Sequence, residues 1–189
     1  TAYEILAWLE FRRVLFRSAL STFSNKADVI IEWRSFQLNP GLKTDPGINI
    51  QEYLSREKGI DINQIKQINN QLKDSGTAVG LNYQFNKIIV ANSMQAHNLL
   101  HEAKIQGKQH LVKENLFQAY FEFGKNIDDQ QVLTEIAQIS DMDLKSTEQA
   151  IFSKLHWNAI QTDIIEAQQL GVRGVPFFVF NRKFAVRGA

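Results

Sequence analysis

Residues 171–180 read GVRGVPFFVF, and this stretch decides how the rest of the chain is interpreted. A loop with two glycines and a proline runs directly into aromatic and β-branched residues that favour a strand. A proline at the start of a strand cannot donate a ladder hydrogen bond and pushes the residue before it toward an extended conformation. If the Val175–Pro176 bond is cis, the backbone of Val175 is left unpaired and can accept an extended peptide by strand addition. The alternative is a trans proline on an edge strand, which is favoured statistically because only about 5% of X–Pro bonds are cis.

The composition is that of an ordinary globular protein. The 189 residues suit one domain, or one domain with an insertion, and 44% of them are hydrophobic and 22% charged. The formal net charge of +1 gives no basic field for nucleic acid. The sequence contains no cysteine, which excludes disulfides, thiolate metal sites and a cysteine nucleophile within these residues. No run of 18 apolar residues predicts a membrane span, and residues 1–20 lack the order of a signal peptide.

The residues that precede this stretch predict one strand, a loop and then a series of helices. Residues 28–36, DVIIEWRSF, predict a buried strand, and residues 37–47, with two prolines and two glycines, predict a loop. Helices are predicted over 50–59, 62–80, 94–108, 108–125, 132–140, 146–155 and 157–171, with an extended piece within 81–90.

Several residues mark the limits of these helices. The predicted N-caps are Asp61, Asn92 or Ser93, Asp128 or Asp129, and Asp143 or Ser146. Gly171 closes the last helix, and residues 176–180 and 183–186 form an antiparallel hairpin around the turn at Asn181 and Arg182. Strands at both ends that enclose helices predict one α/β domain with an inserted helical subdomain.

Other candidate sites have simpler explanations. His97 and His101 have the i, i+4 spacing of two zinc ligands, but no motif places a third ligand, so one packed and one exposed histidine is the favoured interpretation. Asp141 and Asp143 precede a helix, where capping explains them better than acid–base chemistry. The aromatic residues within 116–123 have helical spacing and are interpreted as core. No phosphate-binding or nucleophile-elbow motif is present.

GVRGVPFFVF resembles the cis-proline loop of the thioredoxin superfamily, and the flanking sequence is similar to the DsbA-like branch and its FrnE-like group. The similar stretches are VIIEWRSFQLNPG (29–41), NSMQAHNLLHEAK (92–104), NLFQAYFEFGKNIDDQQVL (115–133) and DIIEAQQLGVRGVPFFVFNRKFAVRGA (163–189). The resemblance covers residue 19 to the end. It implies an α/β thioredoxin-like fold with an inserted helical domain, lacking its first strand and last helix. The thioredoxin-like part would comprise 19–47 and 160–189, and the helical domain 48–159.

The resemblance also implies a chemistry that this sequence lacks. Relatives use a C-x-x-C motif at the start of the first helix, where a lowered thiol pKa makes the attacking thiolate. The family's spacing puts these cysteines near Leu6 and Leu9, and neither is cysteine. Residues 1–18 are anomalous, and EFRRVLFRS at 10–18 resembles a translated sequencing adapter. A corrupted or truncated gene is the favoured explanation, and a genuine amphipathic helix is the alternative.

The expected function follows from the resemblance. It implies a thiol–disulfide oxidoreductase of the DsbA family whose parent enzyme exchanges disulfides in proteins or small thiols, in the cytoplasm, without metal, cofactor, nucleic acid or membrane. Val175 and Pro176 would bind substrate, no catalytic residue remains, and the chain is expected to be redox-inactive. One alternative is a glutathione-dependent isomerase similar to 2-hydroxychromene-2-carboxylate isomerase. The other is a redox-dead module that binds extended peptides at the proline.

Overall fold

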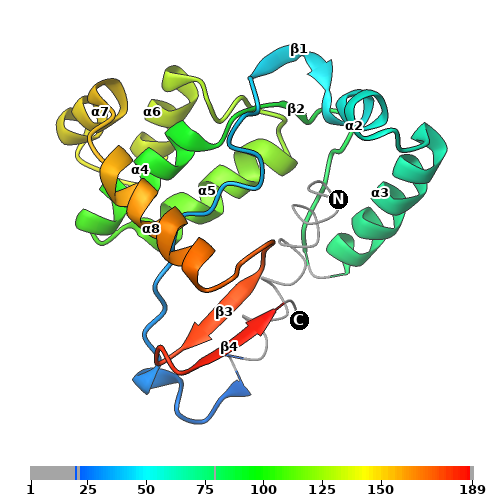
Figure 1. Cartoon of the computed structure of the whole chain (residues 1–189). Helices are drawn as coiled ribbons and strands as arrows, with labels where there is room; N and C mark the ends of the chain where they lie inside the picture. Colours follow the sequence, from blue (N-terminus) through cyan, green and yellow to red (C-terminus); the bar gives the residue numbers. More distant parts are fainter. Residues whose placement is uncertain (1–19, 21, 79, 188–189) are drawn as a thin grey trace.

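The computed structural model describes residues 20, 22–78 and 80–187, and the predictions made for residues 1–18 lie outside this range. The elements follow one another along the chain as Figure 1 labels them. They are a 3₁₀ turn η1 (Lys26–Asp28), β1 (Asp45–Asn49), α2 (Ile50–Lys58), α3 (Ile62–Thr77), β2 (Ile89–Val90), α4 (Met94–Ile105), α5 (Gln109–Phe121), α6 (Gln130–Ile139), α7 (Leu144–Ser153), α8 (Trp157–Gln169), β3 (Phe177–Phe180) and β4 (Phe184–Arg187). None of the helices in these ranges is long and apolar enough to cross a membrane.

The predicted helices are confirmed, and local capping explains where three of them begin. The side chains of Asp61, Asp129 and Asp143 accept backbone N–H groups at the starts of α3, α6 and α7. Each such cap contributes about 1 kcal/mol, because the first N–H groups of a helix have no partner within it. The starts of these three helices were therefore predictable from their N-cap residues.

The predicted buried strand at residues 28–36 is wrong. The structure has no strand there, and the side chains of Val29, Ile30 and Ile31 are exposed, Ile30 by 94%. A high strand propensity describes how a side chain packs against neighbouring strands, and no neighbouring strand pairs with this segment. Instead, residues 32–37 are held by side-chain contacts to helices, as described below.

The predicted loop at 37–47 is also corrected, because its end begins a strand. β1 contains Pro46 and pairs antiparallel with β2, with Asp45 opposite Val90 and Asn49 opposite Ile89. The register shifts between these two pairs. A proline is tolerated in such a ladder because β1 and β2 form a two-stranded sheet whose strands both lie at an edge.

Two hydrophobic clusters form the core of the helical part. The first joins α2 and α3 to the segment around β2 and the end of α5, with buried residues Ile50, Leu54, Ile65, Leu72, Tyr83, Phe85, Ile88, Val90, Ala91, Tyr120 and Phe121. The second lies within the bundle of α4 to α7, with buried residues Ala96, Leu99, Ala103, Val112, Leu116, Ala119, Leu133, Ile136, Ala137, Met142 and Ile151. Because α5 contributes to both clusters, it connects them.

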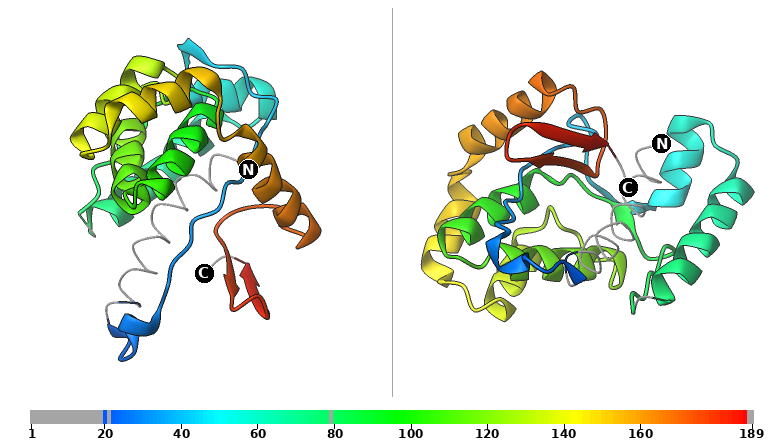
Figure 2. Two further views of the ribbon diagram at one scale, coloured as in Figure 1. Left: turned by 90° about the vertical axis from the view of Figure 1, so that its left-hand side faces the viewer. Right: turned by 90° about the horizontal axis from the view of Figure 1, so that it is seen from below.

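The hairpin of β3 and β4 lies apart from these clusters. Figures 1 and 2 show it following α8 and extending away from the helices, on the side of the molecule where residues 22–33 also run. Its four pairs are in regular register, from Phe177 opposite Arg187 to Phe180 opposite Phe184. The predicted hairpin is thus confirmed, and the proline that precedes it lies between α8 and the first strand.

Candidate functional site

The candidate site is the proline loop, which we define as residues 171–176. It begins with Gly171, whose φ of 69° is the left-handed conformation that favours glycine. The N–H groups of Gly171 and Val172 donate to the carbonyl oxygens of Gln168 and Ala167, at 3.0 and 2.9 Å. This is the Schellman arrangement that ends a helix. It confirms Gly171 as the residue that closes α8 and directs the chain into the loop.

The loop ends at the two residues proposed from the sequence. The Val175–Pro176 peptide bond is cis, and both residues are half-buried. Among the described residues, no hydrogen bond engages the backbone N–H or C=O of Val175. The guanidinium of Arg187 on β4 donates from Nη2 to the carbonyl oxygen of Gly171 at 3.2 Å, so β4 also contacts the loop.

A buried carboxylate on α8 connects the helix that leads into the loop with two other parts of the chain. Asp163 accepts hydrogen bonds from Arg34 Nη1 at 2.7 Å and from the backbone N–H of Ser35 at 2.8 Å. Its Oδ2 atom also lies 3.2 Å from Nε2 of His101 on α4. The side chain of Asp163 is only 2% exposed. These contacts offset the free-energy cost of burying the Asp163 carboxylate, which would be large if it had no partners.

The arrangement around His101 does not form a catalytic relay. Ser35 Oγ and Asp163 Oδ2 both approach the same nitrogen, Nε2, at 3.1 and 3.2 Å. A serine nucleophile with a histidine base requires the carboxylate on one ring nitrogen and the hydroxyl on the other. Burial lowers the pKa of His101, although Asp163 acts in the opposite direction. The group is therefore a structural junction between α4, α8 and residues 34–35.

The same segment is also held on both sides of Arg34 and Ser35, by α5 and by Asn92 before α4. Nζ of Lys113 on α5 lies 3.6 Å from the centroid of the Trp33 ring, a cation–π distance. The amide of Gln37 donates to Asn92 Oδ1 at 3.2 Å. Residues 32–37 therefore occupy a fixed path along the helices even though they pair with no strand.

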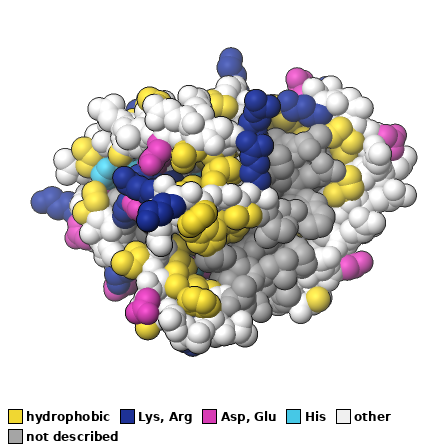
Figure 3. All heavy atoms as spheres, turned by 60° about the horizontal axis from the view of Figure 1, so that its bottom comes forward, with side chains coloured by type: hydrophobic (Ala, Val, Ile, Leu, Met, Phe, Trp, Pro, Cys, Tyr) yellow, Lys and Arg dark blue, Asp and Glu magenta, His cyan; other side chains and the backbone are white. Residues whose placement is uncertain are grey.

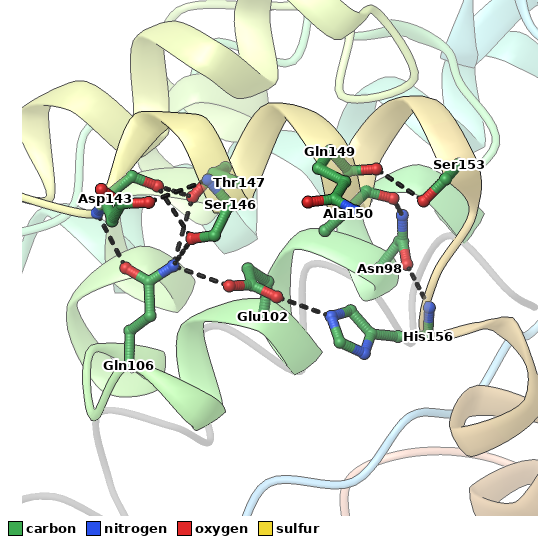
Figure 4. Close-up of polar contacts among 10 residues, drawn as sticks. All are labelled: Asn98, Glu102, Gln106, Asp143, Ser146, Thr147, Gln149, Ala150, Ser153 and His156. Carbon is green, nitrogen blue, oxygen red and sulfur yellow. Dashed lines mark hydrogen bonds and ion pairs between the residues drawn. The ribbon is translucent and has the colours of Figure 1, made fainter.

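The start of α8 is fixed by a second polar group, drawn in Figure 4. The backbone N–H of His156 donates to Asn98 Oδ1 at 3.0 Å, and its Nε2 lies 2.8 Å from Glu102 Oε2. The Gln106 amide donates to the other Glu102 oxygen at 2.8 Å. Burial acts to raise the pKa of Glu102, but the hydrogen bonds from Gln106 and His156 hold it below its ordinary value. Both ends of α8 are thus positioned, one against α4 and one at the loop.

The zinc interpretation of His97 and His101 is not supported by the arrangement found. His101 contacts Asp163 and its side chain is only 13% exposed, and His97 is half-buried, so the predicted pair of one packed and one exposed histidine is not found. In the described part of the chain, no group of three His, Cys, Asp or Glu residues could hold a metal ion.

The remaining sequence candidates are structural, as predicted. Asp143 caps α7 by accepting the N–H of Ser146 at 2.8 Å, which lowers its pKa. Asp141 accepts from Lys108 Nζ at 2.9 Å, and this contact lowers its pKa. Of the aromatic residues at 116–123, Tyr120 and Phe121 are buried in the core, whereas Phe123 is 58% exposed.

The sequence interpretation missed the junction at Asp163. One signal for it existed, because Asp163 lies within the apolar stripe of α8, between the buried residues Ile160 and Ile164. A charged residue on the buried face of a helix needs a partner. The partners Arg34 and His101 could not be named, since they lie far away in the sequence.

We expect the stability of the protein to fall between pH 6.5 and pH 4.5. Burial, with a smaller effect from the charge of His101, lowers the pKa of His97 from 6.5 to about 4. The unfolded chain therefore binds a proton in this window that the folded chain does not, which favours unfolding as the pH falls. The slope is about 1.4 kcal/mol per pH unit at its steepest. Urea unfolding at several pH values measures it.

The matching control compares two histidine substitutions. His97→Gln should flatten this slope, with a residual part from His101, whose pKa is also lowered. His110→Gln should change the slope less than His97→Gln does, because the side chain of His110 is 60% exposed and Glu114 Oε1 lies 3.9 Å from its Nε2 atom. Equal slopes for the wild type and His97→Gln would show that His97 is not the titrating group.

Comparison with known proteins agrees with this architecture. The family described as DSBA-like thioredoxin domain matches residues 12–189. A crystal structure described as a probable DsbA oxidoreductase from Streptomyces coelicolor superposes with a TM-score of 0.90 at 26% identity, over 98% of this chain and 80% of that one. No curated protein matches the sequence. The chain therefore belongs to the DSBA-like thioredoxin domain family of thiol–disulfide oxidoreductases, with a thioredoxin-like α/β fold that is interrupted by inserted helices.

Proposed function

We propose that this chain holds extended segments of thiol- or disulfide-containing substrates at Val175 and Pro176 and does not itself exchange disulfides. The observation that carries the proposal is the backbone of Val175, which has no hydrogen-bond partner among the described residues and lies next to a proline that has no N–H and precedes β3. The second half of the proposal rests on composition. Disulfide exchange needs a thiolate, and the 189 residues contain no cysteine.

The geometry of the hairpin supports peptide binding at this position. Among the described residues, β3 pairs only with β4, and we infer that the other edge of its backbone, next to Val175, accepts a peptide strand. A peptide added to an open edge obtains its affinity from main-chain hydrogen bonds. Val175 adds one hydrogen-bond donor and one acceptor to this edge. The contacts of Asp163 and the Schellman turn at Gly171 keep the loop in position.

One experiment tests both halves of the proposal on the intact chain. In an insulin-reduction assay with dithiothreitol, we expect the rate with protein to equal the rate without it. Binding of a labelled, reduced and unfolded substrate peptide is measured by fluorescence anisotropy. Pro176→Ala should weaken binding at least about tenfold, which corresponds to about 1.4 kcal/mol, because the new N–H lets the β3 ladder extend into the loop.

The control for this variant is Pro40→Ala, which changes an exposed proline in a loop outside the candidate site. It should leave binding unchanged. Accelerated insulin reduction would contradict the redox-inactive half of the proposal. Equal affinities of the wild type and Pro176→Ala would contradict the binding half.

The finer assignment to the FrnE-like group belongs to the same proposal. It is supported by the resemblance of residues 29–41 and 92–104 to that group. The resemblance also supports a cytoplasmic location and small thiols as a second class of substrate. Binding assays with a small thiol in place of the peptide test that class directly.

A further inference from the structure

The proline loop and the hairpin carry an unusual distribution of charge. Residues 170–187 contain four cationic side chains and no Asp or Glu. The cations are Arg173, Arg182, Lys183 and Arg187. Since the whole chain has a net charge of +1, the remaining residues together carry −3, so the positive charge is concentrated at this end.

These cations are available to a ligand. All four side chains are exposed, and within the described ranges none of them forms an ion pair with a carboxylate. This contrasts with Arg34, Lys104 and Lys108, which all pair with acidic residues. Figure 3 views the molecule with the hairpin end forward and shows Lys and Arg side chains beside apolar ones on this face.

The cations lie at the two ends of β3. Arg187 is opposite Phe177, the first residue of β3, and contacts Gly171, while Arg173 lies within the proline loop. Arg182 and Lys183 lie beyond the other end, in the turn to β4. A strand advances about 3.3 Å per residue, so the two pairs are separated by about 20 Å, the length of roughly six extended residues.

Apolar side chains lie between these ends. Directly opposite residues of an antiparallel pair share a face, and alternate residues along a strand share it too. By this rule Phe178, Phe180, Phe184 and Val186 lie on one face of the hairpin. Phe184 is 69% exposed, and Phe180 and Val186 are each 48% exposed. An extended ligand along β3 would therefore meet positive charge, apolar surface and positive charge in turn.

We propose that this site selects extended peptides with acidic residues at both ends of a short apolar segment, spaced by roughly six residues. The inference rests on the proposed binding of peptides at Val175 and Pro176 and adds the class of peptide bound. The acidic groups pair with Arg173 and Arg187 at one end and with Arg182 and Lys183 at the other. Charge complementarity of this kind chooses between partners that share the same backbone contacts.

The test compares three reduced peptides that share one apolar centre and one cysteine. Their flanking residues are Glu, Gln or Lys, and their ends are acetylated and amidated so that only side chains carry charge. Fluorescence anisotropy with the intact chain should show the Glu peptide binding about tenfold more tightly than the Gln peptide, and the Lys peptide most weakly. The difference between the Glu and Gln peptides should shrink as salt is raised, because ions screen exposed charges.

Two double variants locate the effect. Arg182→Gln with Lys183→Gln should reduce the preference for Glu over Gln and leave the affinity for the Gln peptide unchanged. Lys66→Gln with Lys73→Gln removes the same charge from exposed positions on α3 and should change neither quantity.

The outcomes separate this inference from the proposed function. Equal binding of the Glu and Gln peptides by the wild type would overturn the acidic selectivity and leave peptide binding intact. No binding of any of the three peptides would overturn both. Displacement of the Glu peptide by an equal concentration of a single-stranded oligonucleotide would show a general anion site and overturn the selectivity for peptides.

Discussion

Replacing Asp163 with alanine should lower the free energy of unfolding by about 2–4 kcal/mol. The carboxylate is buried and holds Arg34, the backbone N–H of Ser35 and His101 together. Without it, the N–H of Ser35 remains buried with no acceptor, which alone costs about 1–3 kcal/mol. Arg34, whose side chain is 42% exposed, then keeps its charge but loses its buried partner. Urea unfolding at pH 7, followed by circular dichroism, measures the loss.

The control is Glu166→Ala, one helical turn further along α8. Glu166 approaches the same guanidinium of Arg34 at 3.8 Å, but its side chain is 43% exposed. Exposed pairs contribute little, so we expect a loss below about 1 kcal/mol. If the two variants lost similar amounts of stability, Asp163 would not be the junction that joins α8 to α4 and residues 34–35.

Replacing Gly124 with alanine should have a comparable effect, about 3–5 kcal/mol, for a different reason. Gly124 follows α5 with a φ of 64°, and a Cβ atom there would lie 2.4 Å from the backbone oxygen of Lys87. Backbone atoms cannot give way as the end of a flexible side chain can. The loop after α5 would have to move away from residues 84–87, which precede β2, where Val90 is buried.

Gly59 provides the matched control for this substitution. It has the same φ of 64°, at the end of α2, but a Cβ atom would have no neighbour within 4 Å. Gly59→Ala should therefore cost only the left-handed backbone strain, about 1–2 kcal/mol. The difference between the two variants, measured by the same urea unfolding, isolates the steric overlap with Lys87. A difference near zero would show that the loop adjusts freely.

Both effects concern positions that the sequence interpretation did not single out. Gly124 resembles an ordinary glycine after a helix, and the sequence marks Asp163 only as a charged residue within the apolar stripe of α8, without naming its partners. The helices themselves were predictable, because a cap such as Asp129 and an apolar periodicity act within a few residues of each other. The proline loop was predictable for the same reason, since Gly171, Pro176 and the strand after them are contiguous.

The failures share one cause as well. Residues 28–36 have the composition of a buried strand, yet no strand pairs with them, and β1 formed where prolines and glycines predicted a loop. Strand formation depends on a partner that the local sequence does not contain. The candidate site follows this division. Val175 and Pro176 were proposed as substrate-binding residues from the sequence, whereas the exposed hairpin face, and the lack of a backbone partner for Val175 among the described residues, needed the structure.

The sequence by itself therefore determined the helices, their caps, the hairpin, the proline loop, the family resemblance and the absence of any thiol. Only the tertiary structure decided what holds α8 against α4, where residues 32–37 run, and that four exposed cations lie near the two ends of β3. The physical reason is distance along the chain. Caps, turns and helical periodicity are interactions between near neighbours, whereas Arg34 and Asp163 are 129 residues apart and meet only after the chain has folded.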